Sequence, residues 1–541
     1  MSWRSCIAAA LALLASGAAA AQQAPRPDPA VTQHTLKLKG RTLAYTATAG
    51  LMPIRTADGA AMIGDMFYAA YTLPPRNNET RPVAFIWNGG SGANSTPLHY
   101  GAFGPKRLAD GALKPNEATL LDVSDIVFLD QIETGFGRYA SGANFHPHLN
   151  QRTDAYTFAT FIETYLRDHG GPDRPLVLIG ESYGVRRAQL VTEDLLARKI
   201  APEALVLISG YSLVGKRLEP AADGAFRMTG YAALALHRDL LKYSSWKSQT
   251  EIHDATVSWA QLLVKKIDHG DVTARTDLAE GLSRFLGYSS QEIAQPGFPL
   301  DPRTTTAALG NLSRKHAPLL FSDIYNPNAY DLRHWDSDGR EWISQAIIDD
   351  LRHGLGVNPG ERIYVGQEYD GRSAAGLMLG SPQPMKVKRA DGTIVYLTPE
   401  TAHLFPELQG AMSALTGRPA PTPAPRPADG LAVSLVNFSV HFGASLSITD
   451  SPMPELMVAA PGMELFVIGG MYDDLVPCAV GAEMARRDLA DFQNRVRSKC
   501  YVGGHMMYDE EAEGAILSDD VRAFIRATKA DDGIAGAAVM P

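Results

Sequence analysis

A serine stands between two glycines at the point where an apolar segment of the chain ends. Ser182 lies in GESYG (180–184), directly after the apolar run LVLIG (176–180) and before a predicted helix. A nucleophilic serine sits on a tight turn from a strand into a helix, and small residues two positions away on each side avoid a clash. Glycine and serine are also common in ordinary turns, but the strand before and the helix after favour Ser182 as a nucleophile.

A serine nucleophile needs a histidine base and an acid that orients the base. Two aspartates, Asp473 and Asp474, come just after the apolar run ELFVIGG (464–470), and His505 comes after the predicted strand in RVRSKCYVGG (495–504). The chain thus offers serine, acid and histidine in that order, each just past a strand. The pattern predicts a Ser-His-Asp triad, and both aspartates are candidates for its acid.

A glycine-rich turn could supply a third element of the same chemistry. The segment WNGGSGANS (87–95) follows the apolar run VAFIW (83–87). A Gly-Gly turn at a strand end can direct backbone N–H groups into a cavity, as the oxyanion hole of an acyl-transfer enzyme requires. An ordinary glycine-rich turn is the alternative, and the serine motif favours the oxyanion hole.

Four short apolar runs predict central strands that are buried on both faces of a sheet. They are VAFIW (83–87), DIVFLD (125–130), LVLIG (176–180) and ALVLIS (204–209). A stretch with helical spacing lies between the second and third runs, and strands that alternate with helices predict an α/β fold with a mostly parallel sheet. Alternating segments between Thr35 and Leu73 predict antiparallel strands ahead of it.

The strand pattern is interrupted after about residue 215. Residues 216–455 contain helical stretches and a Pro-rich linker at 417–430, and strands return after residue 464. We therefore expect one α/β domain, made of residues 32–215 and 456–530, with a large, mainly helical cap insertion at 216–455. Two consecutive domains are the alternative, but the last two strands would then have no sheet to join.

The composition limits the classes of function. The 541 residues carry a formal net charge of −9 at pH 7, with 45% hydrophobic and 20% charged residues. This is typical of a soluble globular protein and argues against broad binding to nucleic acid. The sequence has no H-E-x-x-H pattern and no cysteine-rich metal spacing, so no metal or other cofactor is expected.

The N-terminus predicts a secretory signal peptide at residues 1–21. Arg4 precedes a short apolar run and small residues ending in Ala-x-Ala, which places cleavage near Ala21. A membrane anchor is the alternative, but the run is shorter than the ~20 residues that a span needs. The mature protein is expected to be periplasmic or secreted. Its two cysteines, Cys478 and Cys500, would there form a disulfide or remain as buried thiols.

Five blocks between residues 83 and 509 resemble signatures of the serine carboxypeptidase family, in the same order. WNGGSG resembles W-x-N-G-G-P-G, GESYG resembles G-E-S-Y-A-G, and DIVFLDQIETGFGRY resembles F-L-D-x-P-x-G-x-G-F-S-Y. GMYDDLVP and GGHMMYDE are similar to G-D-x-D-x-x-V-P and A-G-H-M-V-P. Beyond these five blocks, YNPNAYDLRHW in the insertion is similar to a Y-D-I-R segment. The resemblance implies an α/β-hydrolase fold and leaves most of the insertion and the N-terminus uncovered.

The resemblance also implies roles for the candidate catalytic residues. Ser182 would be the nucleophile and His505 the general base. Asp473 would be the acid, because it stands three residues after Gly470, as the family's acid does, with Asp474 as the fallback.

Five further positions receive roles in substrate binding from the resemblance. The backbone N–H groups of Gly90 and Tyr183 would form the oxyanion hole. Asn88, Glu181 and the backbone of Gly89 would bind the C-terminal carboxylate of a peptide. In the family this glutamate is protonated, which favours acidic pH.

Four positions depart from the family. The second acid that supports the glutamate aligns with Ala102, so the carboxylic-acid network is incomplete. Ser91 replaces a proline, Ala93 a half-cystine and Arg187 a common tyrosine. Without that half-cystine the family's bridge to the insertion is absent, and Cys478–Cys500 would instead tie the acid-bearing loop to the strand before the histidine.

The expected function is that of a serine carboxypeptidase, which releases C-terminal amino acids from peptides through an acyl-enzyme intermediate. Ala102 motivates a first alternative, an esterase or acyltransferase with the same triad, because weaker carboxylate recognition would relax exopeptidase specificity. A second alternative is a catalytically silent binding protein on the same fold. The intact triad residues argue against the latter.

Overall fold

The structure is a computed structural model. It describes residues 27–74, 80–89, 93–140, 151–210, 218–241, 245–296, 300–310, 331–333, 344–359, 362, 364, 385–388, 394–397 and 452–530. The predicted signal peptide at 1–21, the linker at 417–430 and Gly90 lie outside the described residues.

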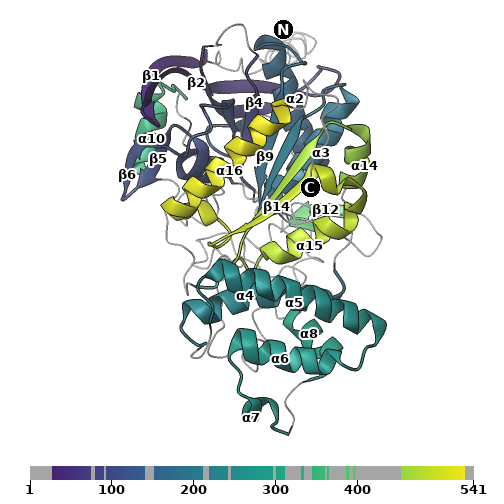
Figure 1. The fold of residues 1–541 in the computed structure, drawn as a ribbon. Coiled ribbons are helices and arrows are strands. Elements are labelled where there is room, and N and C mark those ends of the chain that lie inside the picture. Colours follow the sequence, from purple (N-terminus) through teal and green to yellow (C-terminus); the bar gives the residue numbers. More distant parts are fainter. Residues whose placement is uncertain are drawn as a thin grey trace, which may run out of the picture.

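A ten-stranded sheet forms the centre of the molecule (Figure 1). Its order is β1-β2-β3-β7-β4-β9-β10-β13-β14, with β8 paired to β3. The strands are β1 (Ala30–Leu38), β2 (Arg41–Arg55), β3 (Met62–Thr72), β4 (Val83–Trp87), β7 (Asp125–Leu129), β8 (Arg138–Tyr139), β9 (Leu176–Glu181), β10 (Ala204–Ile208), β13 (Glu464–Gly470) and β14 (Val496–Tyr501). The strands from β7 to β14 run parallel, and β1 to β3 are antiparallel. The predicted mostly parallel sheet is confirmed.

The central strands are apolar at every position because both faces of the sheet are covered. In β4, Val83, Phe85 and Trp87 lie in one apolar core, whereas Ala84 and Ile86 lie in the other. Successive strand residues point to opposite faces, so a strand with two covered faces needs an unbroken apolar run. The edge strand β1 instead alternates in burial along its length.

Helices cover the two faces of the sheet. On one face lie α2 (Gln151–Asp168), α3 (Tyr183–Ala197) and α14 (Met453–Ala459). On the other lie η1 (Pro97–Phe103), α10 (Gln345–Asp349), η3 (Asp350–Gly354) and α16 (Glu511–Ala530), which crosses the sheet in Figure 1. The helix predicted between the second and third apolar runs is α2, and its apolar stripe, including Phe158, Phe161 and Tyr165, is buried against the sheet.

A helical layer lies beyond one end of the sheet (Figure 1). It comprises α4 (Pro220–His237), α5 (Gln249–His269), α6 (Ala274–Leu286), α7 (Ser290–Ile293) and α8 (Pro302–Gly310). These helices belong to the segment between β10 and β13, so they form the predicted helical cap. Of these helices, α4, α5 and α6 share an apolar core with Tyr472, Ala479 and Val480, which follow β13. The limits of the insertion at residues 216 and 455 stay a prediction.

Shorter elements complete the described fold. They are β5 (Lys106–Ala109), β6 (Ala112–Pro115), β11 (Met385–Lys388), β12 (Ile394–Leu397), α15 (Cys478–Asp488), η6 (Ala490–Arg495) and η7 (Met507–Asp509). The hairpin β5–β6 was not expected from the sequence. Its turn is Asp110-Gly111, with φ angles of 52° and 75°. Asp-Gly favours such tight turns, and this dipeptide is the signal that could have predicted the hairpin.

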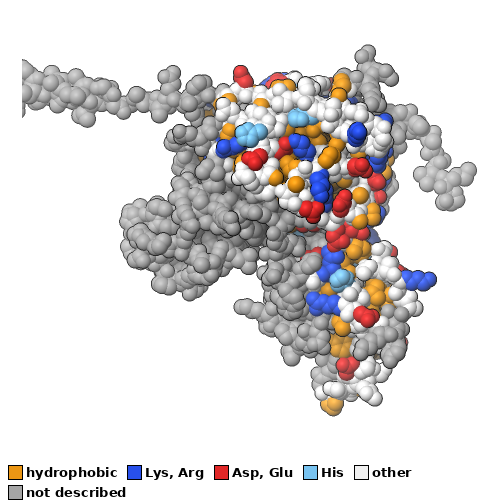
Figure 2. Space-filling model, turned by 90° about the vertical axis from the view of Figure 1, so that its left-hand side faces the viewer, with side chains coloured by type: hydrophobic (Ala, Val, Ile, Leu, Met, Phe, Trp, Pro, Cys, Tyr) orange, Lys and Arg blue, Asp and Glu red, His pale blue; other side chains and the backbone are white. Residues whose placement is uncertain are grey.

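The surface carries both signs of charge. On the face shown in Figure 2, acidic and basic side chains are interspersed over the described residues. No helix in the described ranges combines the length and apolar character that crossing a membrane requires.

Candidate active site

The turn that holds Ser182 joins the end of β9 to the start of α3. Ser182 has φ 56° and ψ −124°, a strained conformation for a residue with a side chain. Its backbone N–H donates to Ile208 O at 2.8 Å, which fixes the turn to the neighbouring strand. A Cβ on Gly180 would meet the carbonyl of Gly184, and a Cβ on Gly184 would lie 2.9 Å from Trp87 Cδ1. Both glycines of the motif are therefore required by close packing.

His505 and Asp473 form a buried pair. His505 Nδ1 lies 2.8 Å from Asp473 Oδ2, and the two side chains are 6% and 0% exposed. The other carboxylate oxygen of Asp473 accepts hydrogen bonds from the backbone N–H groups of Leu475 and Val476, at 3.0 and 2.9 Å. Asp474 points elsewhere, because its Oδ1 lies 3.3 Å from the Tyr231 hydroxyl of the cap. Of the two candidate acids, Asp473 is the one that contacts the histidine.

Adjacent parallel strands bring these residues to one edge of the sheet. Ser182 follows β9, Asp473 follows β13 and His505 follows β14, and the carboxyl ends of parallel strands meet at the same edge. Between them, Ser209 follows β10 and donates from Oγ to His505 O at 2.7 Å. A serine on a strained strand-to-helix turn, followed by an acid and a histidine after the last two strands, decides the fold class. The chain has the α/β-hydrolase fold.

Within this α/β-hydrolase fold, Glu181 is a buried acid next to the nucleophile candidate. Its side chain accepts hydrogen bonds from the Tyr508 hydroxyl, which lies 2.9 Å from each carboxyl oxygen. Asn88 Nδ2 donates to Glu181 Oε2 as well, and Asn88 Oδ1 accepts from Leu98 N at 3.0 Å. Ala102 is buried in η1 and supplies no acid. The polar partners of Glu181 thus come from an amide and a phenol.

Burial and neighbouring charges set the protonation of this cluster. Burial raises the pKa of Glu181 to about 7, against the opposing effects of His505, Tyr508 and Asn88. Burial alone would lower the pKa of His505, but the Asp473 carboxylate, the hydrogen bond to it and Glu181 outweigh burial and raise that pKa above 6.5. Burial also raises the pKa of Asp473 against the influence of His505. The pKa of Glu181 and that of His505 thus both lie above their ordinary values, and each group contributes to the shift of the other.

Of the two residues expected to form the oxyanion hole, Tyr183 lies within the described residues and Gly90 does not. Tyr183 is the first residue of α3, so its backbone N–H belongs to the group of donors that a helix leaves without intrahelical partners. Gly89 passes directly over the turn, since a Cβ there would contact Tyr183 N and lie 2.7 Å from Ser182 Cβ. The segment that leads to Gly90 therefore crosses the nucleophile turn at close range, and Gly90 itself lies outside the described residues.

Arg187 is a buried connector behind the turn. Its side chain is 1% exposed, and Nε lies 2.8 Å from Asp154 Oδ2 on α2. Its two terminal nitrogens donate to Asn88 O and Gln131 Oε1, each at 2.8 Å. The Tyr183 hydroxyl donates to the same Asp154 oxygen at 2.9 Å. Arg187 thus holds the helix after Ser182 against the Asn88 backbone.

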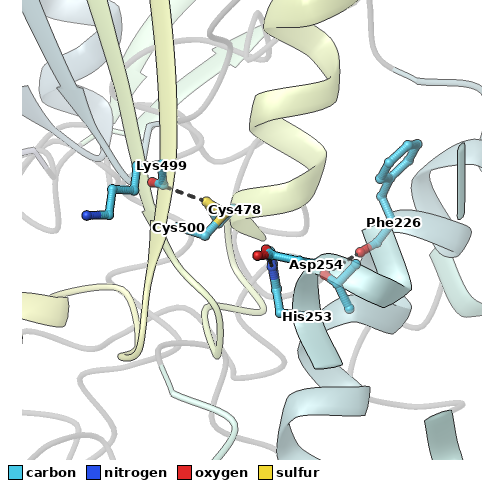
Figure 3. The surroundings of a disulfide bond; sticks show 7 residues. Phe226, His253, Asp254, Cys478, Lys499 and Cys500 are labelled. Carbon is cyan, nitrogen blue, oxygen red and sulfur yellow. Dashed lines mark hydrogen bonds and ion pairs between the residues drawn. A yellow bond between two sulfur atoms is a disulfide. The ribbon is translucent and has the colours of Figure 1, made fainter. Parts of the chain in front are cut away.

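The expected disulfide Cys478–Cys500 is present. Figure 3 shows that it joins the start of α15 to β14, with Phe226, His253 and Asp254 of the cap helices drawn beside it. Cys478 lies five residues after Asp473, and Cys500 lies five residues before His505. The bond therefore ties the loop of the acid to the strand that leads to the histidine.

A short piece of the insertion lies against the loop that carries Asp473 and against the segment that follows His505. In residues 331–333, the Leu332 N–H donates to Tyr472 O at 2.9 Å. Arg333 pairs with Glu510 at 2.5 Å, and its guanidinium lies 4.5 Å from the centre of the Tyr472 ring. This piece belongs to the YDLR segment, which is similar to the Y-D-I-R segment named in the sequence analysis. It contacts Tyr472, directly before Asp473, and Glu510, five residues after His505.

Apart from the fallback acid Asp474, which turns toward the cap, the structure brings together the described residues singled out in the sequence for this site: Ser182, Asp473, His505, Tyr183, Asn88, Gly89 and Glu181. Sequence reasoning missed Tyr508 and Ser209 as neighbours of the site. Tyr508 could have been noticed, because GGHMMY has tyrosine where the compared block A-G-H-M-V-P has proline. Ser209 carries no comparable signal beyond its position directly after β10.

No known protein-family profile matches the sequence, and no curated protein sequence matches it. Among solved structures, the chain is similar to the prohormone-processing carboxypeptidase Kex1 of Saccharomyces cerevisiae, at 15% identity over 90% of this chain and 91% of that one, with a TM-score of 0.45. It is also similar to a thermophilic esterase from Thermogutta terrifontis, at 11% identity, 89% and 99% coverage and a TM-score of 0.34. A proline iminopeptidase of Mycobacterium smegmatis is similar at 10% identity, 89% and 100% coverage and a TM-score of 0.33. These similarities concern the fold, and the function proposed below rests on the site residues.

Proposed function

We propose that this protein is a serine carboxypeptidase-type hydrolase, which releases C-terminal amino acids from peptides through an acyl-enzyme. The observation that carries the proposal is the combination of a strained serine turn, a buried His505–Asp473 pair and a buried Glu181 next to the serine. The first two suit acyl transfer in general. The third supports a site that binds a carboxylate beside the scissile bond.

In the proposed acylation step, Ser182 Oγ attacks the peptide carbonyl carbon and His505 Nε2 takes the Oγ proton. Asp473 holds Nδ1 of the ring, which leaves Nε2 as the nitrogen for this transfer. The backbone N–H groups of Tyr183 and Gly90 would stabilise the oxyanion. The imidazolium then returns its proton to the nitrogen of the departing amino acid as the C–N bond breaks.

Deacylation in this proposal repeats the sequence with water. His505 takes a proton from a water molecule while its oxygen attacks the ester carbonyl carbon, and the same donors would hold the second oxyanion. The proton then passes from His505 to the Ser182 oxygen as the shortened peptide leaves with a new C-terminal carboxyl group.

The protonated form of Glu181 supports exopeptidase specificity. The pKa of Glu181 is about 7, so at and below this pH a substantial fraction of the Glu181 carboxyl groups carries a proton. The protonated group can donate a hydrogen bond to a substrate carboxylate. Asn88 and the Gly89 backbone would contribute further donors. An ionised Glu181 would instead repel the carboxylate.

A comparison of two substrates tests the proposal. A blocked dipeptide with a free C-terminal carboxylate should be hydrolysed with a much higher kcat/KM than the same dipeptide with a C-terminal amide. Ser182→Ala should abolish both activities, whereas Ser124→Ala, a buried serine outside the site, should retain them. Equal kcat/KM values for the two dipeptides would contradict carboxypeptidase specificity.

An esterase or acyltransferase is the second candidate, and Ala102 is the observation that favours it. No second carboxyl stands at that position to support recognition of a substrate carboxylate. Simple ester hydrolysis that proceeds without preference for a neighbouring carboxylate would identify this function.

A catalytically silent binding protein on the same fold is the remaining alternative. If Ser182 does not react with a fluorophosphonate while the fold is intact, the protein would be of this kind.

We further propose that the mature protein is exported. The signal-peptide pattern at residues 1–21 supports export, and the disulfide is of the kind that persists in oxidising compartments. N-terminal sequencing of the protein from a cell fraction outside the cytoplasm should begin near residue 22. An uncleaved N-terminus in that fraction would contradict this interpretation.

A further inference from the structure

The carboxyl group of Glu181 is held by a residue that the triad does not use. Tyr508 is fully buried, and its hydroxyl lies 2.9 Å from both Glu181 oxygens. It belongs to η7, which begins two residues after His505. The hydroxyl reaches both oxygens and Asn88 Nδ2 donates to Oε2, so the two side chains together fix the position and the plane of the carboxyl group.

Tyr508 is itself held firmly against η1. Arg107, which is 7% exposed, donates from Nη2 to Tyr508 O at 2.7 Å and to Asp509 O at 3.1 Å. Its Nη1 donates to Gly101 O, one residue before Ala102. The Arg107 guanidinium thereby links the Tyr508 backbone to η1, the helix that contains Ala102. The phenol has little freedom to leave Glu181.

We propose that Tyr508 is a positioning residue that holds Glu181 and lets it titrate as a single carboxyl group, so that protonated Glu181 can bind the C-terminal carboxylate of a peptide up to neutral pH. This inference rests on the proposed function and identifies what would set the pH range of its substrate recognition.

The chemistry of a phenol explains why the titration is that of one group. A hydroxyl can donate to an ionised carboxylate and to the carbonyl oxygen of a protonated carboxyl group, so Tyr508 serves Glu181 in both states and leaves the Glu181 proton for a substrate carboxylate. Burial, followed by the charges of Glu181 and Asp509, raises the pKa of Tyr508 well above 10, which keeps the phenol neutral. A second carboxyl in its place would add a charge and share one proton with Glu181.

The other groups that act on Glu181 come from three further segments. His505, after β14, stabilises the ionised form, and Asp473, after β13, destabilises it. Asn88, after β4, donates to it without titrating. Together with burial these groups place the pKa of Glu181 at about 7, so a carboxylate substrate should bind well below this pH and poorly above it.

The pH dependence of KM tests the role of Tyr508. With a blocked dipeptide that carries a free carboxylate, KM of the wild type should rise above pH ~7 by about tenfold per pH unit, because ionised Glu181 repels the substrate. In Tyr508→Phe the ionised form loses a charge-assisted hydrogen bond, so the rise should begin about one to two pH units higher. In Glu181→Gln the rise should disappear, because an amide does not ionise.

A matched control separates this effect from a general loss of packing. Tyr100 is another buried tyrosine whose hydroxyl donates to a buried carboxylate, Asp350 Oδ2, at 3.1 Å. Tyr100→Phe should leave the KM profile where it is in the wild type. If Tyr508→Phe also left the profile unmoved, Tyr508 would not set the titration of Glu181 and the inference would be wrong.

A readout that does not require activity separates the inference from the proposed function. Infrared difference spectra across pH should show a carboxyl group of the wild type that deprotonates near pH 7 and is missing in Glu181→Gln. Its midpoint should move upward in Tyr508→Phe. Absence of such a group from the wild type refutes the inference even if Tyr508→Phe does not fold. A shifting midpoint in a protein that releases no C-terminal amino acid would refute the proposed function alone.

Discussion

Replacing Arg187 by methionine would remove a buried charge from the interface between α2 and α3. The Arg187 and Asp154 side chains are 1% and 4% exposed, and Nε and Oδ2 lie 2.8 Å apart. Methionine keeps an apolar chain that can pack on Phe158, over which the guanidinium now lies at 4.4 Å. The Asp154 carboxylate would then be left with the Tyr183 hydroxyl as a donor and without its charge partner.

The magnitude follows from this burial. Removing one partner of a buried ion pair costs ~3–5 kcal/mol, because the other charge stays desolvated and uncompensated. Among the described residues no donor reaches Asp154 Oδ1, so the structure offers that oxygen no substitute. We therefore expect Arg187→Met to lower the free energy of unfolding by about 4 kcal/mol. This is a large part of the ~5–15 kcal/mol that typically stabilises a folded domain.

Urea denaturation followed by tryptophan fluorescence measures the loss. Arg152→Met is the matched control, because Arg152 joins the same two helices through Glu193 at 2.6 Å, with side chains that are 65% and 41% exposed. An exposed pair of this kind contributes ~0–1 kcal/mol. The contrast between the two variants isolates the effect of burial on otherwise similar ion pairs.

A double variant provides the decisive comparison. Asp154→Asn combined with Arg187→Met removes both charges and keeps an oxygen that can accept from the Tyr183 hydroxyl. It should be more stable than Arg187→Met alone, because no uncompensated charge remains. If Arg187→Met lost no more stability than Arg152→Met, or if the double variant were no more stable than Arg187→Met, the reasoning from the buried pair would be refuted.

Three further predictions concern the triad and its disulfide. Asp473→Asn should lower kcat by about 10³–10⁴-fold because the imidazole loses the acceptor that fixes its orientation, and a steady-state assay that finds less than a tenfold drop would contradict the assigned role. With an ester substrate that lacks a carboxylate, kcat/KM should fall as the pH decreases through the pKa of His505, which lies above 6.5, because His505 must be neutral to act as the base. In Glu181→Gln this fall should occur at lower pH, because the charge of Glu181 helps to raise the pKa of His505. An unchanged pH dependence would count against the coupling of the two groups. Replacing Cys478 and Cys500 together by serine should cost about 3 kcal/mol, since the bond closes a loop over a sequence separation of 22; thermal unfolding should show a lower midpoint, and an unchanged midpoint would mean that the bond adds no stability.

The parts of the site that the sequence predicted are those that depend on local pattern. The turn around Ser182 could be predicted because Gly180 and Gly184 are needed for close packing wherever such a turn occurs. The positions of Asp473 and His505 followed from the apolar runs before them, since parallel strands place their carboxyl ends together. The antiparallel strands ahead of the parallel sheet were readable for the same reason, from period-two alternation.

The parts that could not be predicted depend on contacts between distant segments. The residue pattern alone did not choose between Asp473 and Asp474, because the choice depends on which carboxylate turns toward His505 and which toward the cap residue Tyr231. A buried arginine on an amphipathic helix has no local signal, and the partner of Arg187 lies 33 residues earlier in the chain. Tyr508 meets Glu181 across 327 residues, so neither spacing nor periodicity could join them.

The contacts of residues 331–333 have a consequence for how this protein loses its structure. The backbone N–H of Leu332 donates a hydrogen bond to the carbonyl of Tyr472, next to Asp473. Arg333 forms an ion pair with Glu510, five residues after His505. Opening this piece of the insertion therefore removes a hydrogen bond and an ion pair from the loops that carry the acid and the base. Segments joined in this way tend to open as one cooperative unit. Under mild denaturant, amide hydrogens in the 472–476 loop and at Leu332 should exchange together, and activity should be lost in the same step rather than after the sheet unfolds.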